Sequence, residues 1–284
     1  MNVSVIIPFY QNSEWLRQAL DSVFAQTEPP QEVIVVNDGA AEDIAPLCRA
    51  YHGRVTLIEQ PHSGCAAARM NGIRRAKGEV LAFLDADDLW EPEKLAVQTA
   101  LMEQGGYMWS ATAYTTFGVG QAKTVCPFQT PQLCHQLLLA SAQIGTPTVM
   151  VRRRAFAEAP ALAFPLDQRV GEDTVLWCRL AAKYPLGVVP QALVKVRLRG
   201  ENAHLTGRAN IEARAAIWQK IKAGDQGLER PAGWRTRTGY RLCALLDRVL
   251  KNRRLPRVVN RALYALPYVL FRSDAKKLRK QLAQ

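Results

Sequence analysis

Hydrophobic and polar positions follow two different periods along the first third of the chain. The run from Val3 to Pro8 is continuously apolar, which is typical of a parallel strand covered on both faces. The apolar positions from Trp15 to Phe24 then fall at helical spacing. The same alternation predicts strands over 32–36, 55–59 and 80–84, and helices over 42–51 and 65–76. Regular alternation of strands and helices favours an α/β fold, with a mostly parallel sheet and helices on both of its faces.

The middle third is less regular, and the last part is helical. Strands are predicted over 107–117, 146–152 and 188–199, and helices over 131–142, 153–158 and 172–183. Further on, two apolar stripes recur at helical spacing. The first comprises Leu242, Leu245, Leu246, Val249 and Leu250, and the second comprises Val258, Val259, Ala262, Leu263 and Leu266. We therefore expect an α/β domain that ends near residue 205 and a helical extension over 206–284.

Composition places the chain among ordinary globular proteins. With 48% hydrophobic and 22% charged residues, it can bury a sizeable core. No two of its six cysteines are spaced as CxxC, so neither a zinc cage nor a redox pair is indicated, and scattered cysteines are typical of the cytoplasm. There is no run of about 18 apolar residues, so no membrane-spanning helix is predicted. The N-terminal apolar run lacks a basic flank, and we therefore expect a strand there and not a signal peptide.

The net charge of +12 is concentrated at one end of the chain. Residues 224–284 hold 15 Lys and Arg against 4 Asp and Glu, whereas residues 1–223 hold 22 against 21. A basic tail of this kind binds nucleic acid, binds anionic lipid, or only keeps the protein soluble. Few aromatic residues are interleaved with its charges, which disfavours nucleic acid, while its apolar stripes suit a helix in the headgroup layer of an anionic membrane. The same stripes would also suit packing on the α/β domain, with the arginines facing water.

Two acidic clusters follow predicted strands, at 37–39 (NDG) and 85–88 (DADD). In open α/β sheets, ligands bind beyond the carboxyl ends of the strands. Three carboxylates within four residues repel one another unless a cation or hydrogen-bond donors neutralise them. Asp85 and Asp87 offer the hard oxygen ligands that Mg²⁺ and Mn²⁺ take together with substrate phosphates. The structural alternative is that Asp87 or Asp88 caps a helix starting near residue 91.

The phosphate-binding loops of dehydrogenases and nucleoside triphosphatases are absent from the sequence. No GxGxxG follows the first predicted strand, and there is no GxxxxGK[ST]. If a nucleotide binds here, a metal ion must coordinate its diphosphate, and the acidic loop at 85–88 offers ligands for such an ion.

Several segments, in their joint order and spacing, resemble family 2 glycosyltransferases of the GT-A fold. They are VIIPFYQN at 5–12, VVNDG at 35–39, AAR at 67–69, GI at 72–73, AKG at 76–78, FLDADDLWEPEKL at 83–95 and GED at 171–173. The resemblance covers about residues 1–200. It implies a GT-A catalytic domain over 1–205, with a nucleotide-binding half at 1–100 and an acceptor half at 101–205, followed by the basic helical extension over 206–284. The GT-A sheet is Rossmann-like, mixed but mostly parallel, and flanked by helices.

The resemblance also implies which residues bind the donor nucleotide. Pro8 and Tyr10 would line the base pocket, and Asp38 would accept a hydrogen bond from the base. Arg69 would lie near the nucleotide, and Asp85 would hold its ribose side. The donor would be a nucleoside-diphosphate sugar, with UDP-sugar favoured over donors that carry thymine or guanine. A turn role for Asp38 beside a glycine is the structural alternative.

Metal and base roles complete the predicted site. The resemblance implies that Asp87 binds the Mn²⁺ or Mg²⁺ that bridges the diphosphate and that Asp173 takes the proton of the acceptor hydroxyl. Acids also favour helix starts for structural reasons, so Asp173 has a structural alternative. His204 lies in a loop after the last predicted strand, where it is a second candidate metal ligand, although a lone histidine is more often a surface residue. Trp90 and Trp109 are candidates for sugar stacking.

Together these residues predict an inverting glycosyltransferase that acts on a glycan or lipid-linked acceptor in cell-surface polysaccharide synthesis. We expect it in the cytoplasm, with the tail as a means of attachment to the inner face of the cell membrane.

Two departures from the family pattern stand out: Met70 follows Arg69 where an Asn is usual, with Asn71 one place later, and Ala40 replaces a Ser. The alternatives are a metal-dependent nucleotidyltransferase, which usually has a Gly-rich basic loop after the first strand, and a nucleic-acid-binding protein acting through the tail.

Overall fold

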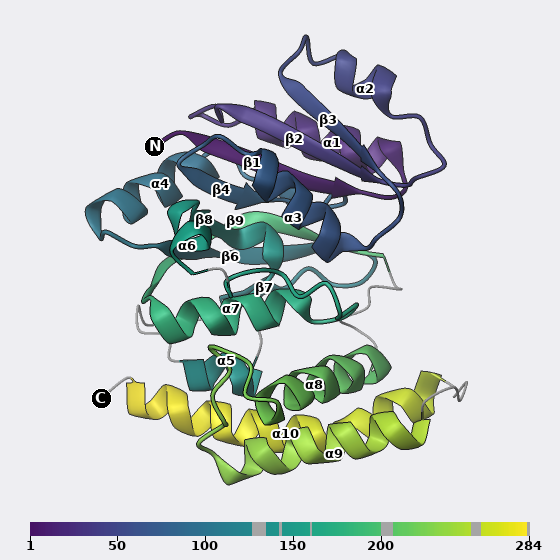
Figure 1. Ribbon diagram of the computed structural model, residues 1–284, viewed down its shortest axis with the longest axis vertical. Coiled ribbons are helices and arrows are strands. Elements are labelled where there is room, and N and C mark those ends of the chain that lie inside the picture. The colour runs from purple at the N-terminus through teal and green to yellow at the C-terminus, as the bar shows by residue number, and fades with distance from the viewer. Residues whose placement is uncertain (127–134, 142–143, 160, 200–206, 251–256, 283–284) are drawn as a thin grey trace. The chain divides into compact units, whose positions relative to one another are not determined.

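The computed structural model describes residues 1–126, 135–141, 144–159, 161–199, 207–250 and 257–282 (Figure 1). The chain forms two compact units. The sheet unit comprises Met1–Pro131, Ile144–Phe164 and Tyr184–Leu198. The helical unit comprises Gln132–Gln143, Pro165–Lys183 and Arg199–Gln284. The helical unit therefore takes in segments from before residue 205, which lie between strands of the sheet unit in the sequence.

One mixed sheet forms the centre of the sheet unit. Its order is β3 (Val55–Gln60), β2 (Glu32–Asp38), β1 (Val3–Phe9), β4 (Val80–Phe83), β8 (Val149–Arg152), β6 (Trp109–Gly118), β9 (Leu186–Leu198) and β5 (Leu89–Trp90), and β7 (Thr124–Val125) pairs with β6. The first four strands in this order are parallel to one another. β8 runs antiparallel to both of its neighbours, and β6 and β9 are parallel again. All seven residues of β1 are buried, as its continuous apolar run predicts.

Helices cover both faces of this sheet (Figure 1). They are α1 (Ser13–Phe24), α2 (Ala45–Arg49), α3 (Cys65–Arg75), α4 (Lys94–Gln104) and α6 (Arg154–Glu158). Leu16, Leu20 and Val23 of α1 are fully buried in the core against β1 and β2. The predicted α/β class, with a mixed sheet flanked by helices and a helical C-terminal part, is thus confirmed.

The departures from the predicted elements are local. The predicted strand 146–152 begins as a 3-10 turn, η1 (Thr146–Thr148), because Pro147 lacks the N–H that a strand ladder needs, and β8 starts only at Val149. β5 and β7 were not predicted, since two-residue strands leave no periodic signal. The helix predicted over 172–183 is observed with the same bounds as α7 (Glu172–Lys183).

The helical unit consists of α5 (His135–Ser141), α7, α8 (Gly207–Lys222), α9 (Trp234–Leu250) and α10 (Arg257–Leu282). Its core joins three helices through aromatic rings. Tyr240 of α9 stacks on Trp218 of α8, with centroids 5.9 Å apart, and meets Phe271 of α10 edge-on at 5.1 Å. Buried Arg214 of α8 lies over the Phe271 ring, 4.3 Å from its centroid, and donates to the Tyr240 hydroxyl.

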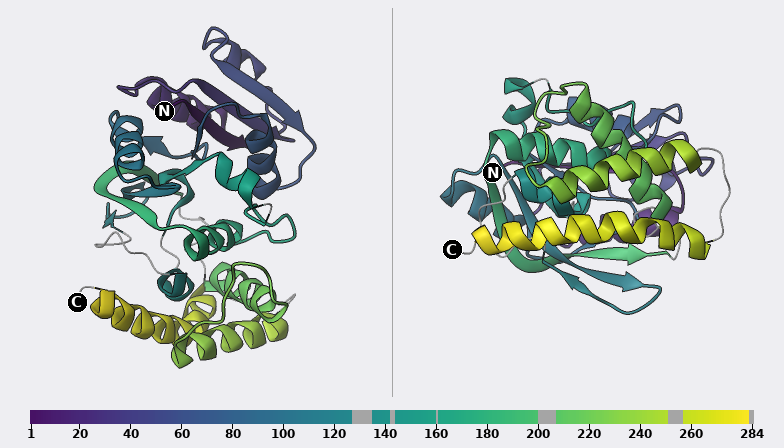
Figure 2. Two further views of the ribbon diagram at one scale, coloured as in Figure 1. Left: turned by 60° about the vertical axis from the view of Figure 1, so that its left-hand side comes forward. Right: turned by 90° about the horizontal axis from the view of Figure 1, so that it is seen from below.

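α9 and α10 run antiparallel (Figure 2). The start of α9 is tied to the later part of α10, because the Thr236 N–H and hydroxyl both donate to the buried carboxylate of Asp274 at 2.9 Å. Gly239 lets the Phe271 ring approach, since a Cβ there would lie 3.0 Å from it. No described helix, α10 included, is long and apolar enough to cross a bilayer.

Only part of the apolar stripe predicted on α9 lies on the buried face of that helix, since Leu250 is buried and Leu242 and Leu246 are half-buried. Leu245 and Val249 are 56% and 53% exposed, while Tyr240 and Cys243 are fully buried. The buried face tolerates polar and small residues because Asp274 satisfies the polar atoms of Thr236 and because Gly239 admits a ring. On α10, Leu266 is likewise exposed, and the side chains at 258, 259 and 262 lie outside the described residues.

Candidate active site

The carboxyl ends of three neighbouring parallel strands meet at one edge of the sheet. β1 lies between β2 and β4, and in this register Phe9 pairs with Asn37 and Ile6 with Phe83. The chain winds from β1 outwards to β2 and β3, and then returns to the other side of β1 as β4. This reversal is a topological switch point, the place where open α/β sheets bind ligands. Tyr10, Asp38 and Asp85 follow or end these three strands, and we call this place the acidic edge.

Asp38 organises the loop that follows β3. Its carboxylate is buried, and its Oδ1 accepts from the Gln60 side chain at 2.7 Å and the Ser63 N–H at 2.8 Å. Its Oδ2 accepts from the Gly64 N–H at 2.9 Å and lies 3.0 Å from Nδ1 of His62. These four donors fill the lone-pair sites that a carboxylate offers. A nucleotide base can reach Asp38 only by displacing one of them, and the His62 ring, 54% exposed, is the most accessible.

Tyr10 and His62 form an exposed ring pair beside Asp38. Tyr10 is 51% exposed, and the two ring centroids lie 4.5 Å apart at an angle of 37°. The approach of the two loops requires Gly39, whose φ is +73° and where a Cβ would lie 2.7 Å from the His62 nitrogen. Pro8, the other residue expected at the base, is buried within β1. A flat apolar surface next to a carboxylate is suited to a nucleotide base.

The loop after β1 is held by a carboxylate from the next loop. Glu42 accepts from the N–H groups of Asn12 and Ser13 at 2.6 and 2.8 Å. Hydrogen bonds from Ser13 and from the Asn12 N–H lower the pKa of Glu42. Asn12 itself has a left-handed backbone and caps α1 through its side chain, which accepts from the Trp15 N–H at 3.1 Å. Tyr10 therefore projects from a loop with a defined conformation.

Arg69 and Asp85 are brought together as an ion pair. Nη2 of Arg69, on α3, donates to Oδ1 of Asp85 at 2.7 Å. Arg69 is 4% exposed, and its guanidinium lies over the Phe164 ring, 5.3 Å from the centroid. The Asp85 side chain keeps 30% of its surface exposed. A buried arginine thus fixes this carboxylate at the strand end while the carboxylate still reaches solvent.

The acidic turn at 85–88 is held from its other side by Arg197 near the end of β9. The backbone N–H of Arg197 donates to Oδ1 of Asp88 at 2.7 Å, and its side-chain Nε donates to the carbonyl oxygen of Asp87 at 2.8 Å. Its Nη2 donates to Gln18 of α1 at 2.7 Å, and its guanidinium lies over Phe117, 4.5 Å from the ring centroid. Arg197 thereby sets the backbone of the turn. Sequence reasoning missed it, because an arginine near a strand end carries no local signal.

The helix-capping alternative for the acidic turn does not hold. α4 begins at Lys94, its cap position is Glu93, and no side chain caps it. Asp88 is buried and hydrogen-bonded to β9, so its role is structural. Burial, together with the nearby charge of Asp88, raises the pKa of Tyr114. Asp87 is half-buried in the middle of the turn. The turn is closed by the Asp88 N–H, which donates to the carbonyl oxygen of Asp85 at 3.0 Å.

The acidic turn supplies the kind of donor set that Mn²⁺ or Mg²⁺ takes. Asp85 and Asp87 present hard oxygen atoms from one turn at the switch point. Within the described ranges, no group of three or more His, Cys, Asp and Glu side chains is placed to hold an ion by itself. A site in which the substrate diphosphate supplies further ligands needs no such group. His204, the second predicted ligand, lies outside the described residues.

Asp173 lies in the helical unit, in the first turn of α7. It is half-buried, and its Oδ1 accepts from the Thr174 N–H at 2.6 Å. The residue before the helix, Gly171, has a φ of +76°, and a Cβ there would lie 2.8 Å from the Cβ of Ala213 on α8. The GED segment therefore needs its glycine for conformation and for packing. Asp173 and Glu172 are the two acidic residues in this first helical turn.

Three further predictions from the sequence can be checked against the structure. The side chain of Asn71 donates to Gln60 at 3.0 Å, and Gln60 donates to Asp38, so this shifted asparagine supports the Asp38 network. The sugar-stacking role of Trp90 and Trp109 is wrong, because both are buried, at 4% and 0% exposure. Their indole N–H groups donate to the carbonyl oxygens of Pro147 and Tyr184, so both rings are part of the core.

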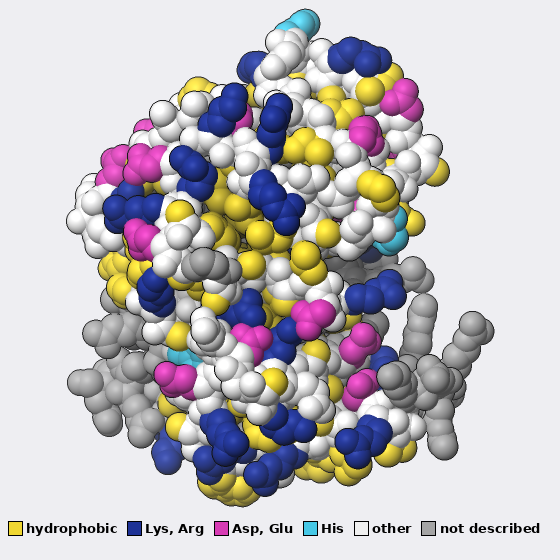
Figure 3. Space-filling view, viewed as in Figure 1, with side chains coloured by type: hydrophobic (Ala, Val, Ile, Leu, Met, Phe, Trp, Pro, Cys, Tyr) yellow, Lys and Arg dark blue, Asp and Glu magenta, His cyan; other side chains and the backbone are white. Residues whose placement is uncertain are grey.

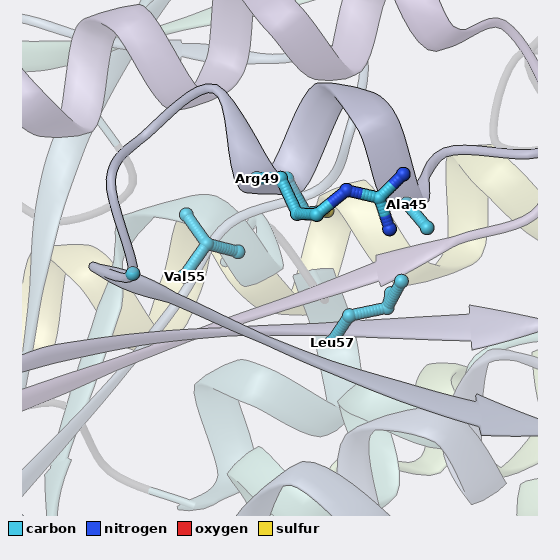
Figure 4. Close-up of a pocket in the computed structure, with 6 residues that line it drawn as sticks. Ala45, Arg49, Val55 and Leu57 are labelled. Carbon is cyan, nitrogen blue, oxygen red and sulfur yellow. The ribbon is translucent and has the colours of Figure 1, made fainter.

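A shallow pocket lies elsewhere in the sheet unit, between α2 and β3 (Figure 4). It is lined by Ala45, Cys48, Arg49, Gly53, Val55 and Leu57. β3 begins at Val55, so the pocket lies beside the amino end of the strand, away from the acidic edge. Burial raises the pKa of the Cys48 thiol to about 11, which makes it a poor nucleophile. We assign this pocket no role.

The mixed sheet with its acidic edge defines an α/β transferase of the GT-A type. The chain belongs to glycosyl transferase family 2, whose model matches residues 4–158. The family predicted from the sequence motifs is thereby confirmed.

Two curated relatives show how far the similarity extends. The chain is 35% identical over 205 residues to an uncharacterized glycosyltransferase of Rickettsia bellii, which covers 70% of this chain and 29% of the relative. It is 29% identical over 187 residues to the putative teichuronic acid biosynthesis glycosyltransferase TuaG of Bacillus subtilis, covering 64% of this chain and 72% of that protein. The chain spans about a third of the length of several Rickettsia relatives that it matches.

A solved structure agrees with the fold. The crystal structure of S. aureus TarS 1-349 in complex with UDP-GlcNAc superposes with a TM-score of 0.67 at 17% identity. The superposition covers 99% of this chain and 92% of that one. At this identity the likeness confirms the GT-A fold.

Proposed function

We propose that the protein transfers a sugar from a nucleoside-diphosphate sugar, with UDP-sugar as the favoured donor, to a hydroxyl of a glycan or lipid-linked acceptor. The product would belong to a cell-surface polysaccharide. The observation that carries this proposal is the acidic turn at the switch point, held from one side by Arg69 and from the other by Arg197. The UDP-GlcNAc complex of TarS supports the choice of donor, and the putative role of TuaG in teichuronic acid biosynthesis supports the kind of product.

The nucleotide would bind across the acidic edge. Its base would lie against Tyr10 and reach Asp38 by displacing the His62 ring, and its ribose would hydrogen-bond to Asp85. Because Arg69 pairs with Asp85, it would hold this carboxylate in a fixed orientation without direct contact with the base. One carboxylate acceptor beside a flat ring is suited to the N–H of a pyrimidine base, and among pyrimidine donors the UDP-GlcNAc complex of TarS favours UDP.

Asp85 and Asp87 would hold a Mn²⁺ or Mg²⁺ ion together with the diphosphate of the donor. The ion supplies charge stabilisation for the departing nucleoside diphosphate. The role of Arg197 is to keep the Asp87 backbone in place, through its bond to the Asp87 carbonyl oxygen. A ligand fixed in this way loses little conformational entropy when the substrate arrives.

Asp173 would be the general base. It would take the proton of the acceptor hydroxyl as that oxygen attacks the anomeric carbon, and the bond from this carbon to the diphosphate oxygen would break. Attack from the face opposite to the leaving group inverts the anomeric configuration. The bond from the Thr174 N–H to Oδ1 would help to orient the Asp173 carboxylate toward the acceptor hydroxyl.

We place the reaction in the cytoplasm, and the state of the cysteines supports this. Cys48, Cys178 and Cys243 are buried free thiols. Burial raises the pKa of Cys178 and of Cys243 to about 12. Such thiols behave as small hydrophobic side chains, which a reducing compartment preserves.

A panel of nucleotide sugars tests the proposal. The purified full chain is incubated with UDP-, TDP- and GDP-sugars in the presence of Mn²⁺, and release of the nucleoside diphosphate is followed. We expect release from at least one UDP-sugar, and loss of that release on addition of EDTA. Release only from TDP- or GDP-sugars would contradict the assigned base. A nucleoside triphosphate that is consumed with release of pyrophosphate would instead support the nucleotidyltransferase alternative.

A further inference from the structure

One face of α9 points away from the core of the helical unit along the whole helix. Its side chains recur every three or four residues, and they are Trp234, Thr238, Arg241, Leu245, Arg248 and Val249. Trp234, Leu245 and Val249 are 61%, 56% and 53% exposed. The opposite side of the helix bears Tyr240 and packs on α8 and α10. Three large apolar side chains therefore share one exposed helix face with two arginines.

α10 exposes a similar face. Leu266, Tyr268 and Val269 are 60%, 48% and 59% exposed, and one to two turns further on Arg272 and Lys276 are also exposed. Phe271 and Ala275 lie on the buried side of the same turns. The apolar side chains thus precede the basic ones along this helix.

The two faces combine into one surface, which we call the outward face. Since α9 and α10 are antiparallel, the apolar part of α10 lies beside Leu245 and Val249, in the later half of α9. α8 packs against both helices on their inner side, so both exposed faces lie opposite to it. Figure 2 shows α9 and α10 side by side at one surface, and Figure 3 shows hydrophobic and basic side chains together along its edge.

Acidic side chains are kept off the outward face. α9 and α10 hold one acidic residue each within their described bounds. Asp247 pairs with Arg208 of α8 at 3.2 Å, and Asp274 is buried against Thr236. Asp274 is thus buried, while Asp247 faces α8 and is neutralised there by Arg208, and the exposed side chains that carry charge on the outward face in the described part of the chain are basic.

We propose that the outward face docks on an anionic lipid bilayer, with its apolar side chains in the headgroup layer and its Arg and Lys side chains among the phosphates. A bilayer surface matches both properties of the face at once, since such helices bind through apolar area and attraction to anionic lipid. A second copy of the chain would bring like charges together, and nucleic acid offers no partner for exposed Leu and Val side chains. This inference is independent of the proposed transfer chemistry.

Vesicle co-sedimentation of the full chain tests the proposal. The vesicles contain phosphatidylcholine and phosphatidylglycerol at three to one, and matched vesicles contain phosphatidylcholine alone. We expect binding to the anionic vesicles at low salt and release at high salt, because exposed charges are screened. Arg272→Gln with Lys276→Gln should weaken binding about 30-fold, since each basic residue near such a surface contributes about fivefold.

A second variant tests the apolar contribution separately. Leu266→Ser with Val269→Ser should also weaken vesicle binding, while leaving the charge unchanged. Two controls match these changes elsewhere in the helical unit: Lys222→Gln with Arg230→Gln removes the same charge, and Leu166→Ser removes a residue that is 63% exposed. Both controls should bind vesicles as the wild type does.

These experiments also distinguish a bilayer from the other partners considered for the outward face, namely a second copy of the chain and nucleic acid. Equal binding by the Arg272/Lys276 variant and its control would overturn the proposal, as would absence of binding to anionic vesicles at low salt. A dimer in sedimentation velocity that the Leu266/Val269 variant dissociates would assign the face to a second copy instead. A salt-dependent gel shift with RNA or DNA, without vesicle binding, would assign it to nucleic acid. Release of nucleotide from a nucleotide sugar by each variant shows separately whether the transferase proposal stands.

Discussion

The acidic edge and the outward face use charge in opposite ways. At the acidic edge, Asp38, Asp85 and Asp88 each accept defined hydrogen bonds from groups that are far away in the sequence. On the outward face, the basic side chains of α9 and α10 extend into solvent, while Asp274 is buried and Asp247 pairs with Arg208 of α8. The first arrangement fixes individual oxygen atoms, whereas the second accumulates charge over an area.

This difference determines how each region should respond to substitution. A site that depends on the position of single atoms fails when one of them is removed, and it is only weakly sensitive to salt. A surface that depends on summed charge loses affinity stepwise and is strongly sensitive to salt. Single substitutions therefore test the acidic edge, and combined substitutions test the outward face.

Removing the predicted metal ligand should have the largest effect. We expect Asp87→Ala to lower kcat/KM on the order of 10³-fold or more, because several kcal/mol of charge stabilisation are lost. The fold should persist, since Asp87 is a half-buried turn residue whose backbone Arg197 holds. Glu93→Gln, which removes a nearby exposed acid, should retain activity. Turnover that EDTA leaves unchanged would show that no metal takes part.

Removing the proposed base should come next. Asp173→Asn should lower kcat by about 10²–10⁴-fold, the usual contribution of general-base catalysis. The affinity for the donor should be nearly unchanged, because the proton moves only in the transfer step. Steady-state kinetics with saturating donor measures the first quantity, and calorimetry measures the second. Activity within a factor of two of the wild type would remove Asp173 from the mechanism.

Loosening the acidic turn should give an intermediate effect. Arg197→Met keeps a long side chain near Phe117 but removes the hydrogen bonds of the guanidinium to Asp87 and Gln18. We expect kcat/KM to fall about 10–100-fold, the effect usual for residues that orient a metal ligand. The Mn²⁺ concentration for half-maximal activity should rise in parallel. If kcat falls while the Mn²⁺ dependence stays unchanged, Arg197 acts on something other than the metal ligand.

Replacing a buried amine in the sheet unit should have the smallest effect on activity and a clear effect on the free energy of unfolding. Lys94 is fully buried, its Nζ lies 4.0 Å from the centroid of the Trp90 ring, and this nitrogen has no hydrogen-bond partner among the described residues. Burial lowers the pKa of Lys94 well below its ordinary value of 10.5. Lys94→Met should raise the free energy of unfolding by about 1–3 kcal/mol near neutral pH, because an unsatisfied buried polar group is removed.

The pH dependence of that gain follows from proton linkage. Between the lowered pKa of folded Lys94 and about 10.5, the unfolded wild type binds more protons than the folded one, so its stability rises with pH. The advantage of the Met variant should therefore shrink as the pH approaches about 10.5. Urea unfolding at several pH values measures this, with Lys222→Met as an exposed control. A Met variant less stable than wild type at every pH would show that the amine stabilises the fold.

Much of the sheet unit could be predicted because its signals are local. The apolar run of β1 and the helical spacing of α1 lie within single elements, and the observed bounds agree closely with the predicted ones. The acidic residues at strand ends follow from the same pattern, since parallel strands place their carboxyl ends at one edge. The pair of Arg69 with Asp85 joins motifs that the family resemblance already linked.

What could not be predicted depends on contacts between distant segments. Arg197 meets Asp88 only because β9 and β5 pair at the end of the sheet. Trp90 and Trp109 resemble sugar-stacking residues in sequence, but carbonyl oxygens from other segments satisfy their indole N–H groups inside the core. On α9, helical spacing identified an apolar stripe correctly, but Tyr240 and Cys243 form the buried side. Periodicity alone does not tell which face a partner helix covers.

Binding of UDP to the acidic edge tests the central claim most directly. Isothermal titration calorimetry with UDP is carried out on the wild type, Asp87→Ala and Asp173→Asn, each with Mn²⁺ and with EDTA. We expect UDP to bind to the wild type and to Asp173→Asn in Mn²⁺, and EDTA or Asp87→Ala to weaken this binding at least about tenfold. Equal affinity of UDP for the wild type and for Asp87→Ala in Mn²⁺ would contradict the central claim.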